Sequence, residues 1–435
     1  MFRHLLYLSV VVISHSLNSN ASDWPQWGGP EGQGHAVGAN YPMQWSPTEN
    51  ITWHTPIPGR GWSSPVIMGD QIWMTTAFEV PTTPERAKER LKTNTADQPL
   101  TLLDEVKFLA ICVDRKTGKI LHEIPLHSEK DPQWVHTLNS YASPTPVLEE
   151  GRAYCHFGTF GTFAVDTKTG KVLWKNTELK LMHENGPGSS PIIWKNQLIF
   201  HCDGSDVQYV VALDKDTGKL AWKTDRSGAM NKNPQLKKSY ATPMVVPMGG
   251  KPVLFSQGAD WLYGYEPQTG KELWKMAYGS LGFSLSARAV TGEGMMYLST
   301  GFLRPQIQAV KFEGESEPKI AWTSTKSAPT MPSLLLTDGS VYFVSDGGIL
   351  VSLDAKTGAE NYRERLGGNF NASPILAGGH IYLFSREGVG YVITPSKTFQ
   401  KTAVNELQAT VMASPAAVDG ALYIRTNKEL LKIGK

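Results

Sequence analysis

Asp114-Arg115-Lys116-Thr117-Gly118-Lys119 is the stretch that decides the fold, because nearly the same six residues return along the chain. Close copies occupy residues 166–171 and 214–219, and copies with some drift occupy residues 266–271 and 354–359. Self-similarity at a period of about 40 to 50 residues indicates one supersecondary unit copied many times. The repeat therefore predicts the architecture, while the chemistry has to be sought elsewhere.

Each copy predicts a hairpin turn. Its carboxylate can accept hydrogen bonds from the turn amides, and its glycine supplies the left-handed conformation that such a turn needs. Four residues after the glycine, several copies place an aromatic side chain, which suits packing between neighbouring units. We therefore assign structural roles in the repeat to Asp114, Gly118, Asp166, Gly170, Trp174, Asp214, Gly218, Trp222, Gly270, Trp274, Asp354 and Gly358.

Each unit starts with a small residue and a proline before an apolar run, as in Ser63-Ser64-Pro65 and Ala142-Ser143-Pro144. Proline is tolerated at the first residue of a strand, where no hydrogen-bond donor is lost. Two further alternating runs follow, and the Asp-x-x-Thr-Gly-Lys turn then leads into a fourth run. Four short antiparallel strands in every unit are typical of a β-propeller.

Counting the starts of the units predicts eight blades, beginning near residues 63, 143, 189, 241, 286, 332, 372 and 413. The fifth unit is degenerate, since Ser286-Ala287-Arg288 stands where other units have their proline. The eighth unit has only three strands of its own. Residues 51–55 resemble a spare strand, and their pairing with the last blade would close the ring and remove two open edges. We expect an all-β, eight-bladed propeller over residues 51–435, closed by this N-terminal strand.

Three segments fall outside the repeat. Residues 1–21 combine a basic start, an apolar run and small residues, which predicts a signal peptide and a periplasmic or secreted protein. The alternative is a cytosolic protein with an apolar start. Residues 22–50 are rich in Trp, Gly and Pro and are expected to wrap the outside of the ring. Residues 79–106 are expected to form an insertion in the first blade, with a short polar helix over residues 84–92.

Composition excludes some classes of function. A formal net charge of +2 and a charged fraction of 19% argue against nucleic-acid binding. No later stretch is long and apolar enough to predict a membrane span. The three cysteines, Cys112, Cys155 and Cys202, leave at least one thiol without an intramolecular partner, and we expect all three to be small core residues on strands. We expect a monomer.

The pattern Ala-x-Asp-x-x-Thr-Gly-x-x-x-Trp at residues 164–174 and 212–222 resembles the tryptophan-docking repeat of pyrroloquinoline-quinone-like (PQQ-like) propellers. From about residue 23 onward, the chain is similar to secreted PQQ-binding-like β-propeller repeat proteins of planctomycete-type bacteria, including its Asp23-Trp24-Pro25-Gln26-Trp27 start. Two better-known relatives imply different functions. One is the quinoprotein alcohol dehydrogenases, and the other is the outer-membrane assembly lipoprotein that acts as a scaffold.

The dehydrogenase resemblance would imply PQQ held between a tryptophan and a vicinal Cys-Cys disulfide, beside Ca²⁺ and a catalytic aspartate. This chain has no adjacent cysteine pair, and no carboxylate matches that calcium site residue by residue. We therefore expect no bound cofactor, and PQQ is implied by kinship alone. The scaffold relative carries a lipid anchor, whereas no cysteine follows the apolar run here.

In a propeller, the loops before the inner strands and the loops between the middle strands share one face and surround the channel. Polar and aromatic residues there could bind a sugar or an anionic group. The alternative is a solvated funnel whose polar groups satisfy one another. The candidate ligand-binding residues are Arg60, Trp62, Tyr141, His183, Glu184, Asn185, Tyr240, Arg288, Arg304, Asn369 and Arg386.

The densest group of ligand-type residues is His201-Cys202-Asp203-Gly204-Ser205-Asp206. Histidine and carboxylate ligands suit several divalent metals, and side chains two apart on a strand share a face. We therefore name His201 and Asp203 as candidate metal ligands, although their spacing matches no common metal motif. No nucleophile elbow, P-loop or His-Glu-x-x-His motif occurs, so no catalytic residue is assigned.

These patterns favour an extracytoplasmic, non-catalytic binding or protein-assembly scaffold that takes a protein partner, a small polar ligand or a glycan. One alternative is a quinoprotein-like oxidoreductase, which the resemblance suggests. Another is a glycan-binding or glycan-processing propeller, suggested by aromatic residues such as Trp62 and Tyr240 near the predicted mouth.

Overall fold

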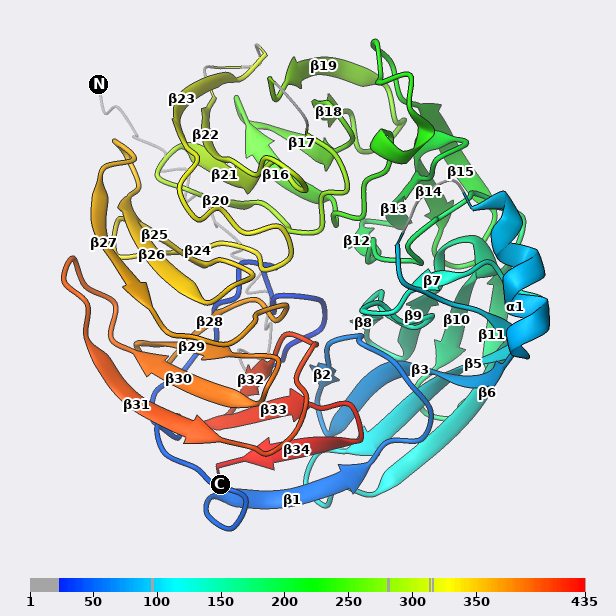
Figure 1. Cartoon of the computed structure of the whole chain (residues 1–435), viewed down its shortest axis with the longest axis horizontal. Helices are drawn as coiled ribbons and strands as arrows, with labels where there is room; N and C mark the ends of the chain where they lie inside the picture. Colours follow the sequence, from blue (N-terminus) through cyan, green and yellow to red (C-terminus); the bar gives the residue numbers. More distant parts are fainter. Residues whose placement is uncertain (1–22, 95–97, 280–281, 313, 315–316, 435) are drawn as a thin grey trace, which may run out of the picture.

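Eight four-stranded sheets stand around a common axis in the computed structural model, which describes residues 23–94, 98–279, 282–312, 314 and 317–434 (Figure 1). Neighbouring strands in these sheets run antiparallel, as in β13 and β14 or β33 and β34. The predicted all-β, eight-bladed propeller is therefore confirmed. The predicted signal peptide, residues 1–21, lies outside the described residues.

Blades 1 to 4 each run outward from an innermost strand that follows a proline. Their strands are β2 (Val66–Met68), β3 (Gln71–Pro81), β5 (Leu103–Asp114) and β6 (Ile120–Lys130); β8 (Val147–Glu149), β9 (Arg152–His156), β10 (Thr162–Asp166) and β11 (Val172–Asn176); β12 (Ile192–Trp194), β13 (Gln197–Asp203), β14 (Gln208–Asp214) and β15 (Leu220–Asp225); and β16 (Met244–Met248), β17 (Lys251–Gln257), β18 (Trp261–Tyr265) and β19 (Glu272–Ala277).

Blades 5 to 8 repeat this order, except that the chain start supplies the outermost strand of blade 8. Their strands are β20 (Val290–Gly292), β21 (Met295–Ser299), β22 (Ile307–Lys311) and β23 (Lys319–Ser324); β24 (Leu335–Thr337), β25 (Ser340–Val344), β26 (Ile349–Asp354) and β27 (Glu360–Arg365); β28 (Ile375–Ala377), β29 (His380–Phe384), β30 (Val389–Ile393) and β31 (Lys401–Glu406); and β32 (Ala416–Val418), β33 (Ala421–Arg425), β34 (Glu429–Ile433) and β1 (Ile51–Pro56).

The predicted closure of the ring is present. Strand β1 pairs antiparallel with β34, and Thr55 lies opposite Leu430. The closing strand also brings Trp53, whose indole Nε1 donates to the carbonyl oxygen of Arg115 at 3.2 Å in the turn of blade 1. Blade 8 therefore contacts blade 1 through a residue from the start of the chain.

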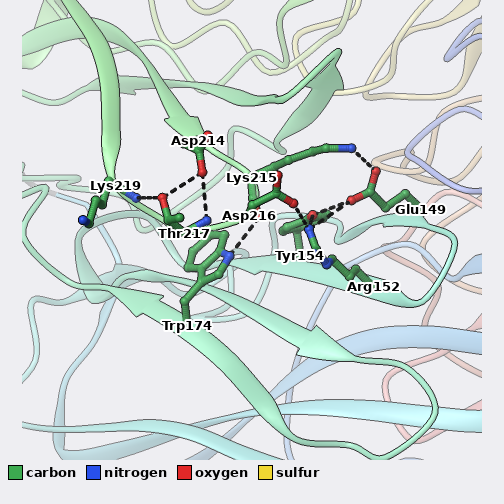
Figure 2. A network of polar contacts seen from close by, with 9 residues as sticks. All are labelled: Glu149, Arg152, Tyr154, Trp174, Asp214, Lys215, Asp216, Thr217 and Lys219. Atoms are coloured by element: carbon green, nitrogen blue, oxygen red, sulfur yellow. Dashed lines mark hydrogen bonds and ion pairs between the residues drawn. The ribbon is translucent and has the colours of Figure 1, made fainter.

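Tryptophan docking joins blades 2 and 3, 3 and 4, and 5 and 6 in the same way, and Figure 2 shows the first of these. Trp174 on β11 donates through Nε1 to the carbonyl oxygen of Lys215 at 2.9 Å, in the turn of the following blade. Ion pairs between Lys215 and Glu149 and between Asp216 and Arg152 surround this contact. The Asp-x-x-Thr-Gly-Lys turn of one blade therefore also binds a side chain of the preceding blade.

The core consists of apolar layers between neighbouring sheets. One cluster joins blades 1 and 2 through Phe108 and Phe163, and another joins blades 3 and 4 through Ile199 and Leu254. Cys112, Cys155 and Cys202 lie on strands, buried and unbridged, as the sequence predicts. Burial raises the pKa of each thiol to about 12, so the thiols act as small apolar groups.

The segment before β1 crosses the end of the channel. Trp24 exchanges two main-chain hydrogen bonds of 2.8 Å with Ile67 of blade 1, and the main-chain N–H of Leu376 in blade 7 donates to Gly34 at 2.8 Å. The sequence predicts that residues 22–50 wrap the outside of the ring. Residues 24–36 instead lie against the innermost strands. Figure 1 shows this dark blue segment near the middle of the ring.

The insertion in blade 1 extends two strands. Strands β3 and β5 remain paired into residues 79–106, as far as Pro81 and Leu103, with a register shift after Val80. The insertion carries α1 (Pro84–Arg90), whose N-terminus is capped by Thr83. It also carries the short strand β4 (Leu100–Thr101), which pairs with β7 (Val135–His136) in the loop that leads to blade 2. Short 3-10 turns occur at Leu91–Thr93, Gly158–Phe160 and Pro234–Leu236. Among the described residues, no helix has the length and apolarity that a membrane-spanning segment requires.

Candidate functional site

The propeller has two faces, which we name by their connections. The turn face carries the Asp-x-x-Thr-Gly-Lys turns, and the loop face carries the loops that lead from each blade into the next. A cavity of about 500 Å³ opens on the loop face along the axis. Its lining includes residues from all eight of these loops, and Trp27 of the N-terminal segment also lines it. Because that segment crosses the turn-face end, the cavity is a funnel with a floor, which we call the axial cavity.

A ring of hydroxyl groups surrounds the channel. The residue two positions before the innermost strand is serine or threonine in seven of the eight blades, namely Ser64, Thr145, Ser190, Thr242, Ser333, Ser373 and Ser414. We call this the hydroxyl belt. The second unit is therefore anchored by Thr145-Pro146, two residues after the Ser143-Pro144 pair that the sequence suggests.

The hydroxyl belt links neighbouring blades. The main-chain N–H of Ser64 donates to Thr145 Oγ1 at 2.9 Å, and the N–H of Thr145 donates to Ser190 Oγ at 2.9 Å. The same bond joins Ser333 to Ser373 at 2.9 Å and Ser373 to Ser414 at 3.0 Å. A hydroxyl before the proline thus satisfies a main-chain donor of the preceding blade, which explains the small polar residue in the repeat.

Arg288 occupies the belt position of the fifth blade, where its guanidinium replaces a hydroxyl. Its main-chain N–H still makes the belt bond to Ser333 Oγ at 2.9 Å. The side chain is only 4% exposed and lines the axial cavity. Its Nη1 donates to the carbonyl oxygen of Trp27 at 3.1 Å, and the guanidinium lies 5.7 Å from the centre of the Trp27 ring.

Arg288 is short of partners. Its Nε has no hydrogen-bond partner, and no ion pair to it is present among the described residues. Burial lowers the pKa of the guanidinium to about 10, because the charged form loses its hydration without a compensating acid. A buried cation of this kind is costly unless something pairs with it.

Two other buried arginines are better satisfied. Arg226 forms a bidentate pair with Asp203, with nitrogen–oxygen distances of 3.0 and 2.7 Å. Arg425 donates through Nη1 to both oxygens of Ser63 and to the carbonyl oxygen of Thr75. Among the described residues, Arg425 has no acidic partner either, and burial lowers its pKa to about 9. Arg288 differs from both in that its buried Nε has no hydrogen-bond partner there.

The rim of the axial cavity is apolar. Leu138, Phe302 and Met331 line the mouth and are 42%, 47% and 39% exposed. Asp346 holds the loop of Met331 in place by accepting hydrogen bonds from the N–H and hydroxyl of Thr330, both at 2.8 Å. The cavity therefore has an apolar mouth, a wall of hydroxyl and amide groups, and a cationic floor.

The predicted ligand-binding residues divide into three groups. Trp62, Asn185, Tyr240 and Arg288 line the axial cavity. Arg60 lies beside it, where its Nη2 donates to main-chain oxygens and its Nη1 pairs with Glu79 at 3.5 Å. The remaining six lie apart from the lining: Tyr141, His183, Glu184, Arg304, Asn369 and Arg386.

Most of these outlying residues have structural partners. Tyr141 is buried and donates to the carbonyl oxygen of Gln133 at 2.7 Å. His183 is buried, and desolvation lowers its pKa to about 3, so the ring is neutral. Glu184 accepts from Ser205 at 2.8 Å. Asn369 bonds Glu387, Arg386 bonds Asn371 at 3.0 Å, and Arg304 is exposed on a loop.

His201 and Asp203 are engaged within the fold. His201 Nε2 is 2.8 Å from the hydroxyl of Ser256, and both carboxylate oxygens of Asp203 bind Arg226. Within the described part of the chain, no group of three or more His, Cys, Asp or Glu side chains is arranged to hold a metal ion.

The axial cavity does not fit PQQ as the dehydrogenases hold it. Its lining among the described residues contains hydroxyls, amides, aromatic rings and one arginine, without an aspartate or glutamate that could hold Ca²⁺. The three thiols lie on separate strands in the blade cores. We therefore derive no reaction step through this cofactor.

Sequence reasoning missed the belt and the floor. The pattern identifies the small residue before the proline only as the start of a unit, and it predicts Trp27 on the outside of the ring. The recurring Ser or Thr at that position was the available signal for the belt. No comparable signal places Trp27 on the axis, because its contact with Arg288 joins residues 261 positions apart.

Comparisons with known proteins agree with the fold. The family model described as outer membrane protein assembly factor BamB matches residues 67–224 and 259–429. Among curated proteins, tetrathionate hydrolase of Acidithiobacillus ferrooxidans is 23% identical over 62% of this chain and 52% of its own length. BamB of Legionella pneumophila is 25% identical over 41% of this chain and 46% of its own length. The chain thus spans about half the length of these relatives.

Solved structures share the architecture. BamB from Moraxella catarrhalis matches with a TM-score of 0.58 at 13% identity, over 88% of this chain and 97% of its own. Quinohemoprotein alcohol dehydrogenase from Comamonas testosteroni matches with a TM-score of 0.63 at 12% identity, over 96% and 82%. At such low identity these likenesses show the fold alone.

Proposed function

Because the chain belongs to the PQQ-like repeat family described as outer membrane protein assembly factor BamB, we propose that it is an extracytoplasmic, non-catalytic binding protein whose ligand enters the axial cavity. The observation that carries this proposal is the cavity itself, which has a floor and is lined from all eight blades. Its volume of about 500 Å³ lies within the usual range for small-molecule sites.

The chemistry of the lining supports binding. Hydroxyl, amide and guanidinium groups supply hydrogen-bond donors and acceptors without changing protonation near neutral pH. General acid–base catalysis instead uses a group that gains or loses a proton at the operating pH. His136 is the titratable lining residue closest to that range, and burial lowers its pKa, so the ring stays neutral. The extracytoplasmic location rests on the signal peptide predicted at residues 1–21.

A binding test with a blocked cavity examines the proposal. Ser373→Phe would fill the axial cavity from the hydroxyl belt. Gly347→Ala is the control, because a Cβ at this position would have open space around it. Citrate, sulfate, tetrathionate and maltose serve as probes in calorimetric titrations.

We expect at least one probe to bind the wild type and the Gly347→Ala variant, and the Ser373→Phe variant to lose that binding by 10-fold or more. We also expect no hydrolysis of tetrathionate, and no dye-linked alcohol oxidation after PQQ and Ca²⁺ are added. Turnover in either assay would contradict a non-catalytic role. If the Ser373→Phe variant still binds the probe, the binding site lies outside the axial cavity.

A second candidate function, protein-assembly scaffolding, is favoured by the apolar rim. Contiguous exposed apolar patches mark protein-docking surfaces. The rim residues Leu138, Phe302 and Met331 would provide such a surface on the loop face. A defined partner that photo-cross-links to a probe at Phe302, and not to one at the exposed Leu220 of β15, would support this candidate.

A further inference from the structure

We infer that the floor of the axial cavity is an oxyanion site, in which Arg288 binds the carboxylate, sulfate or phosphate group of a small anionic ligand. This inference rests on the proposed function, since it names the ligand class of the same cavity. It is carried by the position of Arg288 in the repeat, by its missing partners and by the way the N-terminal segment holds it.

The repeat shows that this arginine is not needed to build a blade. Seven blades place a serine or threonine hydroxyl at the same position, two residues before the innermost strand. The belt bond of blade 5 uses only the main-chain N–H of Arg288. The guanidinium is therefore an addition to the repeat, and it extends from the belt into the cavity lining.

The missing partners indicate what would bind. A guanidinium carries five N–H donors, and Arg288 makes a hydrogen bond from Nη1 to the carbonyl oxygen of Trp27. Arg226, which is equally buried, has both oxygens of Asp203 as its partner. An oxyanion in the axial cavity would provide Arg288 with the kind of partner that Asp203 provides for Arg226, because guanidinium groups match carboxylate, sulfate and phosphate geometry.

The N-terminal segment holds the guanidinium from below. The Trp27 ring faces it at 5.7 Å, and a Cβ on Gly32 would lie only 1.9 Å from Nη1. Gly32 also has a positive φ of 65°, which favours glycine. The segment therefore packs tightly against one side of Arg288 and leaves the cavity on the other side for a ligand.

The surroundings favour an anion over a cation. No aspartate or glutamate is among the described lining residues, so nothing there repels a negative group. Ser286, Ser373 and Asn371 line the same cavity and can donate further hydrogen bonds. The remaining volume accommodates an organic body attached to the anionic group.

The test compares Arg288→Ser with the wild type. The substitution restores the hydroxyl of the other seven blades, so we expect the fold to be retained. Arg304→Ser removes an exposed arginine at a loop between the middle strands of the same blade and is the matched control. Citrate, sulfate and phosphate are titrated by calorimetry at constant ionic strength, and maltose serves as the neutral probe.

We expect at least one of the three anions to bind the wild type and Arg304→Ser equally, and to bind Arg288→Ser at least 10-fold more weakly. Arg288→Gln, which keeps the side-chain length, should lose the same binding and replaces the serine variant if that one fails to fold. The anion that binds most tightly identifies the group recognised.

Two outcomes overturn the inference and separate it from the proposed function. If maltose binds in the cavity and no anion depends on Arg288, the cavity remains a binding site and the oxyanion assignment is wrong. If no anion binds the wild type at 10 mM and maltose does not bind either, neither the oxyanion site nor the cavity proposal stands.

Discussion

At the residue scale, two separate constraints require glycine in the turn, namely its backbone conformation and the space that the docked tryptophan occupies. Gly218 adopts a φ of 71°, which favours glycine, and a Cβ at this position would lie 2.4 Å from the indole of Trp174. Gly270 meets Trp222 in the same way, at 2.3 Å, and Gly358 meets Trp322 at 2.6 Å. The glycine is thus required both by the turn and by the docked tryptophan.

Gly218→Ala tests the requirement for space beside the docked Trp174. We expect a loss of about 2–4 kcal/mol in the free energy of unfolding, because the left-handed conformation costs about 1–2 kcal/mol and displacement of Trp174 adds an overpacking cost of similar size. Gly339→Ala is the control, since Gly339 has a φ of 66° with open space around it, and it should lose only about 1–2 kcal/mol. Urea unfolding measures both, and equal losses would show that the stacking contributes nothing.

At the element scale, the Asp-x-x-Thr-Gly-Lys turn is stabilised by its own carboxylate. Asp214 accepts hydrogen bonds from the Thr217 N–H at 2.9 Å and the Thr217 hydroxyl at 2.7 Å. The Thr217 hydroxyl bond is the largest cause that lowers the pKa of Asp214 below its ordinary value of 3.8. The pKa values of Asp114, Asp166 and Asp354 are lowered in the same way.

These turns predict a loss of stability in acid. A carboxyl group with a folded-state pKa below 3.8 contributes stability that is present above about pH 4 and is lost as the pH falls through the folded value. Asp214→Asn should therefore be less stable than the wild type at pH 6, and the difference should shrink as the pH falls below about 4. Urea unfolding at each pH measures it. Asp225→Asn, outside the turns, is the control, and a difference independent of pH would contradict this account.

At the scale of the whole molecule, the ring depends on the segment before the repeat. Strand β1 completes blade 8, and Trp53 from this strand docks on blade 1. Residues 24–36 add bonds to the innermost strands of blades 1 and 7 across the channel. A closed propeller has few open edges, so its cooperativity depends on this one closure.

Removal of residues 23–56 should lower the melting temperature by roughly 10 °C or more, since about 2–4 °C is lost per kcal/mol in a large domain. The loss arises because β34 becomes an open edge and Trp53 no longer docks. Removal of residues 23–36 alone is the matched control, because it leaves β1 in place, and it should cost clearly less. Differential scanning calorimetry measures both, and an unchanged melting temperature in the longer truncation would end the closure model.

By itself, the sequence determined the blade count, the turn chemistry, the degenerate fifth blade and the closing strand. The first three depend on hydrogen bonds and packing within one unit of about 40 to 50 residues, so a local pattern records them. The closing strand pairs with residues near the other end of the chain, and it was predictable because the eighth unit has only three strands of its own and residues 51–55 form a spare one. Of the candidate ligand-binding residues, four line the axial cavity, namely Trp62, Asn185, Tyr240 and Arg288, and their role in binding stays a prediction.

Only the tertiary structure decided the path of residues 24–36, the hydroxyl belt as a wall, and Arg288 as the cation above Trp27. The physical reason is distance along the chain. The channel exists only when eight loops separated by dozens of residues meet on one axis, and the floor forms only when the chain start reaches blade 5. A local sequence pattern cannot predict such contacts between residues far apart in the chain.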